Sequence, residues 1–286
     1  MKRRELLKTA STVVAASALT ARAAGDQSPP EIVDSNVSLF RWPFRRLPLD
    51  ETDLLVEKMG SLGIGRALAG SFEGVFQRDA EAVNRQLAEA CSGHPELVPI
   101  GSVNPASPGW EDDFRRCVGE HGMPGVRLHP NYHDYALDHP GFLRLLEMAA
   151  EAEAVVQVAA AMEDVRTQND IARAPDVDLA PLPDAMKRAG GGRVQLLNWR
   201  PRGTLSETLA TTPGIHFDTA RIDATDGIAV LLETVPADRI LFGTHAPFLI
   251  PEAALIRAVH ENELEAAPLR RILSGNANQL FKLPTR

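Results

Sequence analysis

Short apolar segments alternate with longer amphipathic segments along the chain from residue 31 onward. Eight of the short segments are five to nine residues long and rich in aliphatic residues, which is typical of buried strands. The predicted strands are 31–39, 66–71, 97–103, 125–129, 154–159, 193–198, 215–219 and 239–244.

The segments between these strands carry apolar residues at spacings of three and four, which predicts helices. The predicted helices are 54–62, 80–91, 110–120, 142–151, 182–189, 227–234 and 251–261, a weaker one at 204–210, and a closing helix at 268–280. Eight strands that are each followed by a helix predict an α/β fold, a single (β/α)₈ TIM barrel, in preference to an open doubly wound sheet. No G-x-G-x-x-G sequence follows the first strand, which argues against a dinucleotide-binding domain.

The N-terminal residues have a different pattern. Arg3 and Arg4 precede a modest apolar stretch at 9–21, and the sequence Ala-Arg-Ala at 21–23 has the form of a cleavage site. We expect residues 1–23 to be a twin-arginine signal peptide, and residues 24–286 to form the barrel. The alternative is an amphipathic helix that stays on the protein. The signal peptide predicts a periplasmic or otherwise exported protein.

Composition narrows the range of partners. The net charge is −8 and no basic run follows the N-terminus, so we expect no nucleic-acid partner. No later segment is apolar over ~18 residues, so we expect no membrane association once the signal peptide is removed. The two cysteines, Cys91 and Cys117, both fall in predicted helices, and two buried thiols are favoured over a disulfide.

Ligand-binding groups of a TIM barrel lie at the C-terminal ends of its strands and in the loops that follow. Most of these positions are polar here, where a purely structural core would be apolar. They include Asn36, Ser38, Arg41, Ser71, Asn104, Arg127, His129, Gln157, Asn198, Arg200, Asp218, Arg221 and His245. The pattern predicts a small-molecule site, although buried polar groups can also simply satisfy one another.

Three sequence motifs point to a family. The segments GVRLHP at 125–130, RILFGTHAPF at 239–248 and SGNA at 274–277 with Leu280 and Phe281 resemble motifs of the amidohydrolase-related proteins (amidohydrolase family 2). The resemblance implies a TIM barrel that hydrolyses a C–N or C–O bond of a small molecule. Some relatives instead decarboxylate aromatic or keto acids.

The same family binds a catalytic divalent metal through histidines and a carboxylate. The corresponding positions of this chain carry other residue types: Asn36, Ser38, Gln157 or Ala159, Asn198 and His245. Neutral amide and hydroxyl oxygens compensate poorly for dehydration of the ion. We therefore expect no metal ligands among these residues and no cofactor.

The replacements nevertheless suggest roles. We expect His245, at the family's proton-handling position, and His129 to be catalytic. We expect six residues to bind substrate: Asn36, Ser38, Arg41, Arg127, Gln157 and Asn198. If the ligand is a carboxylate, a guanidinium must meet its charge, and Arg41 is preferred to Arg127 and Arg200. For His129 and Arg127 the alternative is a purely structural role, and for Arg41 a solvated loop.

Three functions therefore remain open. The first is a metal-free hydrolase of the amidohydrolase type. The second is a non-catalytic barrel that binds a small ligand, and the third is a metal-free decarboxylase or lyase. Retention of His129 and His245 favours an enzyme, whereas the replaced ligands favour a binding protein.

Overall fold

The computed structural model describes residues 31–201, 203–261 and 264–284. Its strands are all parallel to their neighbours and form a three-stranded sheet, β1-β2-β3, and a six-stranded sheet, β4 to β9 in chain order. The strands are β1 (Ile32–Leu39), β2 (Ile64–Ser71), β3 (Leu97–Pro99), β4 (Gly101–Ser102), β5 (Gly125–Leu128), β6 (Val155–Ala159), β7 (Val194–Leu197), β8 (Ile215–Asp218) and β9 (Ile240–Leu241).

Backbone contacts join the two sheets at both edges. The amide of Ile100, between β3 and β4, donates to the carbonyl of Ala69 at 2.8 Å, so β3 and β4 act as one interrupted strand. At the other edge, the amide of Ser35 on β1 donates to the carbonyl of Phe242 at 2.9 Å. Val37 also forms a parallel bridge with Ala246. These contacts arrange the strands as a TIM barrel, as predicted from the alternation of strands and helices.

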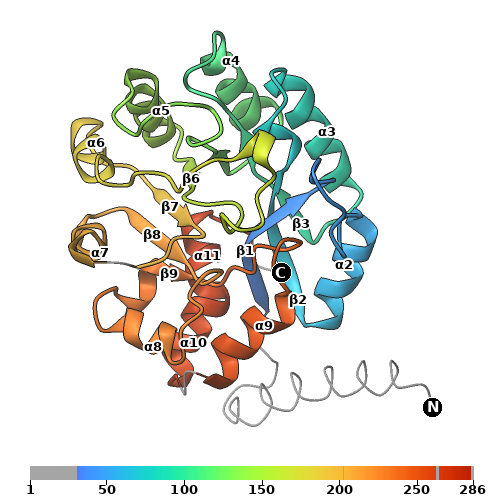
Figure 1. The fold of residues 1–286 in the computed structure, drawn as a ribbon, viewed down its shortest axis with the longest axis vertical. Coiled ribbons are helices and arrows are strands. Elements are labelled where there is room, and N and C mark those ends of the chain that lie inside the picture. Colours follow the sequence, from blue (N-terminus) through green and yellow to red (C-terminus); the bar gives the residue numbers. More distant parts are fainter. Residues whose placement is uncertain (1–30, 202, 262–263, 285–286) are drawn as a thin grey trace.

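Helices surround the strands, as Figure 1 shows. The α-helices are α2 (Thr52–Ser61), α3 (Ala80–Ser92), α4 (Trp110–Arg115), α5 (Pro140–Glu151), α6 (Leu182–Arg188), α7 (Gly203–Thr211), α8 (Gly227–Leu232), α9 (Pro251–Ile256), α10 (Ala266–Arg270) and α11 (Asn276–Leu280). The weak helix predicted at 204–210 is confirmed as α7, and the closing helix is α10 and α11 joined by a wider turn at 271–275.

Helix α5 illustrates how the local sequence positions an element. The His139 side chain caps its N-terminus by accepting a hydrogen bond from the amide of Gly141, and Pro140 occupies the first turn, where a missing N–H costs nothing. Phe142, Leu145 and neighbouring apolar residues at spacings of three and four are buried against the barrel.

One end of the barrel is filled with apolar side chains. Val33, Leu68, Ile100, Val155 and Leu241 come from the strands and pack in one cluster with residues of the C-terminal helix α11 and the residue that follows it, Ala277, Leu280 and Phe281. The strands start at this end, so polar groups are left to the opposite end, where the strands finish.

The structure also bears on two further expectations. Cys91 and Cys117 are both buried free thiols, as predicted. Across the described ranges, no helix is both long and apolar enough to cross a membrane. The predicted signal peptide, residues 1–23, lies outside the described residues.

Candidate ligand site at the barrel mouth

Arg127, on β5, is buried in the barrel and its guanidinium is bound almost entirely by neutral protein groups. Its Nε donates to Gln157 Oε1 at 2.8 Å, and its Nη1 donates to the carbonyl of Val37 at 2.9 Å and to Ser38 Oγ at 3.1 Å. Its Nη2 donates to the carbonyl of Leu68 at 3.3 Å. Burial lowers the pKa of Arg127 to about 10, and the carboxylates of Asp218 and Asp34 oppose that shift. Arg127 thus ties β1, β2 and β6 to β5.

Gln157, on β6, extends this network across the barrel. Its Nε2 donates to the carbonyl of Ser35 at 3.0 Å and to Gln195 Oε1 at 2.8 Å. Gln195 in turn donates to Ser35 Oγ at 2.8 Å, and that hydroxyl donates to the carbonyl of Phe242 at 2.8 Å. Both the oxygen and the nitrogen of the Gln157 side-chain amide therefore hydrogen-bond to protein groups.

Asn36, on β1, and Asn198, just past β7, contact each other directly. Asn36 Nδ2 donates to Asn198 Oδ1 at 2.9 Å and to Asp218 Oδ2 at 2.6 Å. The backbone amide of Asn198 donates to Asp218 Oδ1 at 3.0 Å, and its side-chain amide donates to the carbonyl of Ala161 at 2.7 Å. Asn198 has a φ of 59°, a left-handed conformation that asparagine tolerates better than most residues.

Two buried carboxyl groups complete this part of the mouth. Burial raises the pKa of Asp34 to about 6, although hydrogen bonds from Thr244 and Asn36 oppose the shift. Burial likewise raises the pKa of Asp218 to about 7, opposed by the hydrogen bonds from Asn36 and Asn198. Neither carboxyl forms an ion pair within 4.0 Å of a described cationic side chain.

An aromatic cluster covers the mouth on the other side of these residues. Trp42, in the loop after β1, is buried and its ring lies 5.0 to 6.2 Å, centroid to centroid, from five aromatic rings. These rings are Phe44, Phe72, Phe76, Tyr132 and Phe248. The cluster keeps the adjoining polar groups away from bulk water.

His245 and Arg221 share one acceptor beneath this cluster. His245 Nε2 lies 2.8 Å from the carbonyl oxygen of Met162 and must donate to it, because a carbonyl only accepts. Arg221 Nη2 donates to the same oxygen at 2.9 Å. The Phe248 ring lies 5.1 Å from the His245 ring. Burial, and then the charge of Arg221, lowers the pKa of His245 to about 3.

Arg221 differs from Arg127 in what surrounds it. Its side chain is buried, yet its Nε has no hydrogen-bond partner among the described residues, and no carboxylate there lies within ion-pair distance of its guanidinium. Burial lowers its pKa and the charge of Arg200 lowers it further, whereas the more distant carboxylates of Asp223, Asp176 and Asp164 oppose that shift. His245 Nδ1 also lacks a partner in the described part of the chain, and His245 has a left-handed φ of 56°. Such strain is common at functional sites.

His129 follows β5 and is as buried as His245. Its Nδ1 has no partner within the described ranges, and its ring centroid lies 6.0 Å from that of His133. Burial, with the nearby charges of His133, Arg127 and His245, lowers the pKa of His129 well below its usual value. Both predicted catalytic histidines therefore lie at the mouth as neutral, buried imidazoles.

A cavity of about 640 Å³ opens at the loop that follows Met162, the residue whose carbonyl binds Arg221 and His245. Neither Arg221 nor His245 is itself part of its lining. It is lined by the loop that follows Met162, from Glu163 to Asp176, and by Arg200. Glu163 is buried there and pairs with Arg45, whose guanidinium also lies over the Phe248 ring at 5.3 Å. The third arginine considered from the sequence, Arg200, thus reaches a cavity wall.

Arg41, the arginine preferred from the sequence, does not join this group. Its side chain is 62% exposed and its guanidinium lies 3.6 Å from Glu51. Of the predicted substrate-binding residues, the fold places five in the two hydrogen-bonded networks described above: Ser38, Arg127 and Gln157 in one, and Asn36 and Asn198 in the other. Arg221 is the group that sequence reasoning placed at a strand end without giving it a role. Its signal was its position three residues past Asp218, at the end of β8.

The side chains at the family's metal-binding positions do not form a favourable ligand set. Asn36 points its amide nitrogen, a donor, at Asn198 and Asp218, and the protonated nitrogen of His245 faces Met162. Across the described residues, no three His, Cys, Asp or Glu side chains are grouped to hold a metal ion. Donor groups that face inward compete with a cation for the available oxygens.

The fold and this mouth define a TIM-barrel protein with a polar site at the strand ends. An amidohydrolase family model (Amidohydro_2) matches residues 43–283, and the chain belongs to that family. No curated protein matches the chain significantly.

Solved structures agree with this assignment. A 2,6-dihydroxybenzoate decarboxylase from Rhizobium superposes with a TM-score of 0.70 and 16% identity, over 88% of this chain and 99% of that one. A dihydroxybenzoic acid decarboxylase from Polaromonas sp. JS666, with bound manganese and 2-nitroresorcinol, superposes with a TM-score of 0.69 and 16% identity, over 90% of this chain and 98% of that one. A 5-carboxyvanillate decarboxylase from Novosphingobium aromaticivorans, complexed with manganese and a nitrobenzoic acid, superposes with a TM-score of 0.71 and 13% identity, over 89% of this chain and 96% of that one. At these identities the likeness shows the shared fold.

Proposed function

We propose that the protein binds a small carboxylic acid at the β8–β9 side of the barrel mouth and decarboxylates it without a metal. The observation that carries this proposal is the buried guanidinium of Arg221, which has no carboxylate partner in the described chain and shares the Met162 carbonyl with His245. The comparisons support it, because several structural neighbours of the same fold are decarboxylases.

A buried charge without a counter-charge is costly, because desolvation is not repaid by pairing. A ligand carboxylate would supply that charge to Arg221 through a charge-assisted hydrogen bond, the geometry for which a guanidinium is best suited. Arg200 lies close enough for its charge to lower the pKa of Arg221 further, so a second cation adds to the attraction, and Asp223, Asp176 and Asp164 offset part of it without pairing with Arg221. A neutral ligand would leave the repulsion between the Arg221 and Arg200 guanidinium groups uncompensated.

The surroundings suit decarboxylation better than hydrolysis. Loss of carbon dioxide turns a charged carboxylate into a neutral gas, and a site shielded from water by Trp42 and Phe248 favours that change. Hydrolysis needs a second reactant, an activated water, whereas loss of carbon dioxide needs only a proton donor. We therefore propose a metal-free decarboxylase in place of the metal-free hydrolase expected from the resemblance.

His245 would supply the proton. In the proposed reaction the C–C bond to the carboxylate breaks, carbon dioxide leaves, and the electron pair stays on the substrate carbon. That carbon takes a proton from Nδ1 of protonated His245, which is then reprotonated from water, so each turnover consumes one proton. Ligand binding would raise the pKa of His245 and so favour its protonated form, because a carboxylate on Arg221 offsets the positive charge that lowers this pKa. His129, neutral and buried nearby, would orient the ligand.

The first experiment tests binding. We expect 2,6-dihydroxybenzoate to bind the wild-type protein in calorimetric titrations, and its methyl ester, which lacks the negative charge, to bind much more weakly. Arg221→Met should weaken carboxylate binding by about 30-fold or more, because it removes a buried charge-assisted contact. Arg41→Met is the matched control and should bind as the wild type does, since Arg41 is exposed to solvent and lies beside Glu51, outside the proposed site. Equal affinity of wild type and Arg221→Met would refute this site.

The second experiment tests turnover. Carbon dioxide release from 2,6-dihydroxybenzoate and 5-carboxyvanillate should be insensitive to a chelator and to added Mn²⁺. His245→Gln should lower turnover by roughly 10²–10⁴-fold while binding changes little. Turnover that requires Mn²⁺ would overturn the metal-free proposal. Binding with no release of carbon dioxide from any tested acid would instead support the non-catalytic binding protein.

A further inference from the structure

A second cavity, of about 590 Å³, lies on the opposite side of the mouth from Arg221. It is enclosed by the loops that follow β2, β4 and β5 and by one residue of α4: residues 74–78 with Ala80, residues 102–104 and 106–108, residues 132–134, and Asp113. None of these residues lines the cavity beside Arg200. Its volume falls in the range of sites for small organic ligands.

Three polar groups in the lining of this cavity have no hydrogen-bond partner among the described residues. They are the hydroxyl of Ser102, the hydroxyl of Tyr132 and Nδ1 of His133. Ser102 is only 2% exposed. Buried polar groups are normally paired, so three unpaired groups in one wall indicate that something else supplies their partners.

The chemistry of each group can be assigned. His133 Nε2 lies 3.2 Å from the carbonyl of Gly74 and must donate to it, so Nδ1 is an acceptor. Burial lowers the pKa of His133, which keeps the ring neutral. The hydroxyls of Ser102 and Tyr132 can each donate and accept. The unpaired set is therefore uncharged, with one acceptor and two groups of either kind.

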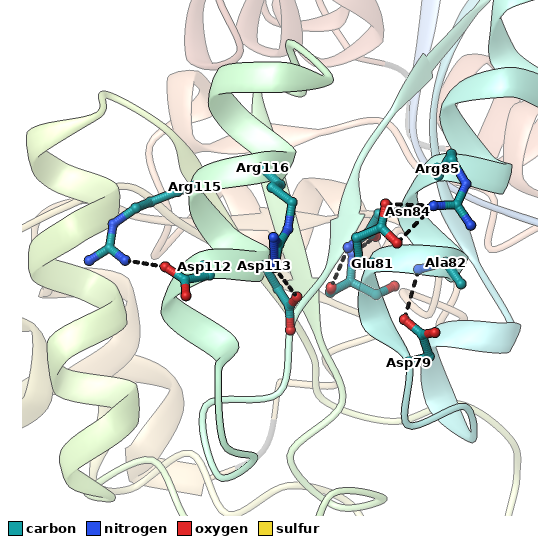
Figure 2. Close-up of polar contacts among 10 residues, drawn as sticks. Asp79, Glu81, Ala82, Asn84, Arg85, Asp112, Asp113, Arg115 and Arg116 are labelled. Atoms are coloured by element: carbon teal, nitrogen blue, oxygen red, sulfur yellow. Dashed lines mark hydrogen bonds and ion pairs between the residues drawn. The ribbon is translucent and has the colours of Figure 1, made fainter.

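The position of Ser102 is fixed by its backbone. Asn84, on α3, accepts a hydrogen bond from the amide of Ser102 at 2.6 Å and donates to its carbonyl at 2.9 Å. Figure 2 shows Asn84 beside the charged residues of α3, across from α4. On its other side, a Cβ at position 74 would overlap the Ser102 hydroxyl, so only glycine leaves room for it there. The hydroxyl is thus held in place without using its own hydrogen bonds.

The rest of the wall combines aromatic faces with charges of both signs. Phe76 is 39% exposed, and its ring lies 5.6 Å from that of Tyr132. Arg78 and Asp113 both line the cavity, and a carboxylate oxygen of Asp113 lies 3.6 Å from the guanidinium of Arg116. Figure 2 shows these two side chains together on this side of the barrel. Asn104 adds a side-chain amide. A charged ligand would meet a charge of its own sign in this wall, the carboxylates of Asp113 and Asp134 for an anion or the guanidinium of Arg78 for a cation, whereas a neutral molecule with several hydroxyls would not.

The geometry points to a second binding site, for a small neutral polyhydroxylated molecule such as a monosaccharide or a polyol. Its hydroxyls would pair with Ser102, Tyr132 and His133, since each hydroxyl both donates and accepts. Its apolar face would lie against Phe76 and Tyr132. The site uses another cavity and other residues than the carboxylate site proposed above.

The test is saturation-transfer NMR on the full-length protein with D-glucose, D-galactose, myo-inositol and glycerol as probes. We expect transfer to at least one of them, followed by a titration to obtain its Kd. Tyr132→Phe and Ser102→Ala should each weaken that binding by roughly fivefold, because each removes one hydrogen-bonding hydroxyl. Tyr135→Phe is the matched control. Its hydroxyl is also buried and unpaired within the described chain, but Tyr135 lies outside the lining of this cavity, so binding should not change.

The outcomes separate cleanly. Absence of transfer to all four probes would overturn the site, and so would equal weakening by Tyr132→Phe and Tyr135→Phe. Binding of ethanolamine or acetate in preference to the polyols would overturn the neutral class of ligand. Arg221→Met should leave polyol binding unchanged, so failure of the carboxylate site would not be confused with failure of this one.

Discussion

Two buried arginines lie near the same end of the barrel, and their surroundings differ. Arg127 is 2% exposed and donates to Gln157, Ser38 and two carbonyl oxygens. Arg221 is 5% exposed and has a single hydrogen bond in the described chain, to the Met162 carbonyl that it shares with His245. Burial alone therefore does not identify a ligand-binding arginine. The hydrogen bonds left unmade distinguish Arg127, which holds strands together, from Arg221, which we propose binds a ligand.

The largest expected effect is the loss of stability on replacing Arg127, the arginine to which the comparison gives a structural role. Arg127→Met should lower the free energy of unfolding by about 3–5 kcal/mol, because it leaves Gln157 and the carbonyls of Val37 and Leu68 buried without their donor. Arg221→Met is the paired variant and should change stability by less than about 1 kcal/mol, since it removes a charge that is already poorly compensated. Urea denaturation of both proteins measures the difference. Similar losses in the two variants would contradict the distinction.

The buried carboxyl groups near Arg127 give a second test. Burial raises the pKa of Asp218 to about 7, above the value of an unfolded chain, so the folded state binds the proton more tightly. Its contribution to stability is then fully present below pH ~4 and is lost as the pH rises toward 7. The free energy of unfolding should fall by roughly 4 kcal/mol between these limits, since the pKa shift is about three units and each unit corresponds to about 1.4 kcal/mol. Asp218→Asn cannot titrate and should flatten this dependence in urea denaturations from pH 4 to 8. An unchanged slope would assign the pH dependence to other groups.

The smallest effect concerns His245, on the ligand side of the comparison. Burial and Arg221 lower its pKa to about 3, so its protonated form becomes more abundant as the pH falls. Proton donation by His245 predicts that carbon dioxide release increases by up to about tenfold for each pH unit between 7 and 5. The kcat/KM profile measures this, with protein stability checked at each pH. A rate that rises with pH would assign His245 the role of a base and would contradict the proposed proton transfer.

Much of the fold follows from local sequence. Each predicted strand overlaps an observed strand, and β3 with β4 occupies the predicted strand 97–103. Runs of aliphatic residues separated by amphipathic segments leave few alternatives to a parallel barrel. The family assignment was also readable from the motifs at 125–130 and 239–248, because it depends on residue identity at fixed spacings.

The candidate site was predictable only in part. The sequence placed His129, His245 and the polar strand ends at the mouth, because strand C-termini of a parallel barrel meet at one end. It favoured Arg41 over Arg127 and Arg200 as the carboxylate ligand, and gave Arg221 no role. In the folded chain, Arg41 is exposed and Arg221 is buried beside His245.

The sequence by itself therefore determined the alternation of strands and helices, the family and the end of the barrel that is polar. Only the tertiary structure decided which buried groups are already paired. Arg127 meets Val37, 90 residues away, and Arg221 meets Met162, 59 residues away. Local patterns record which side chains are polar, but the number of hydrogen bonds that each one makes depends on segments distant in the chain.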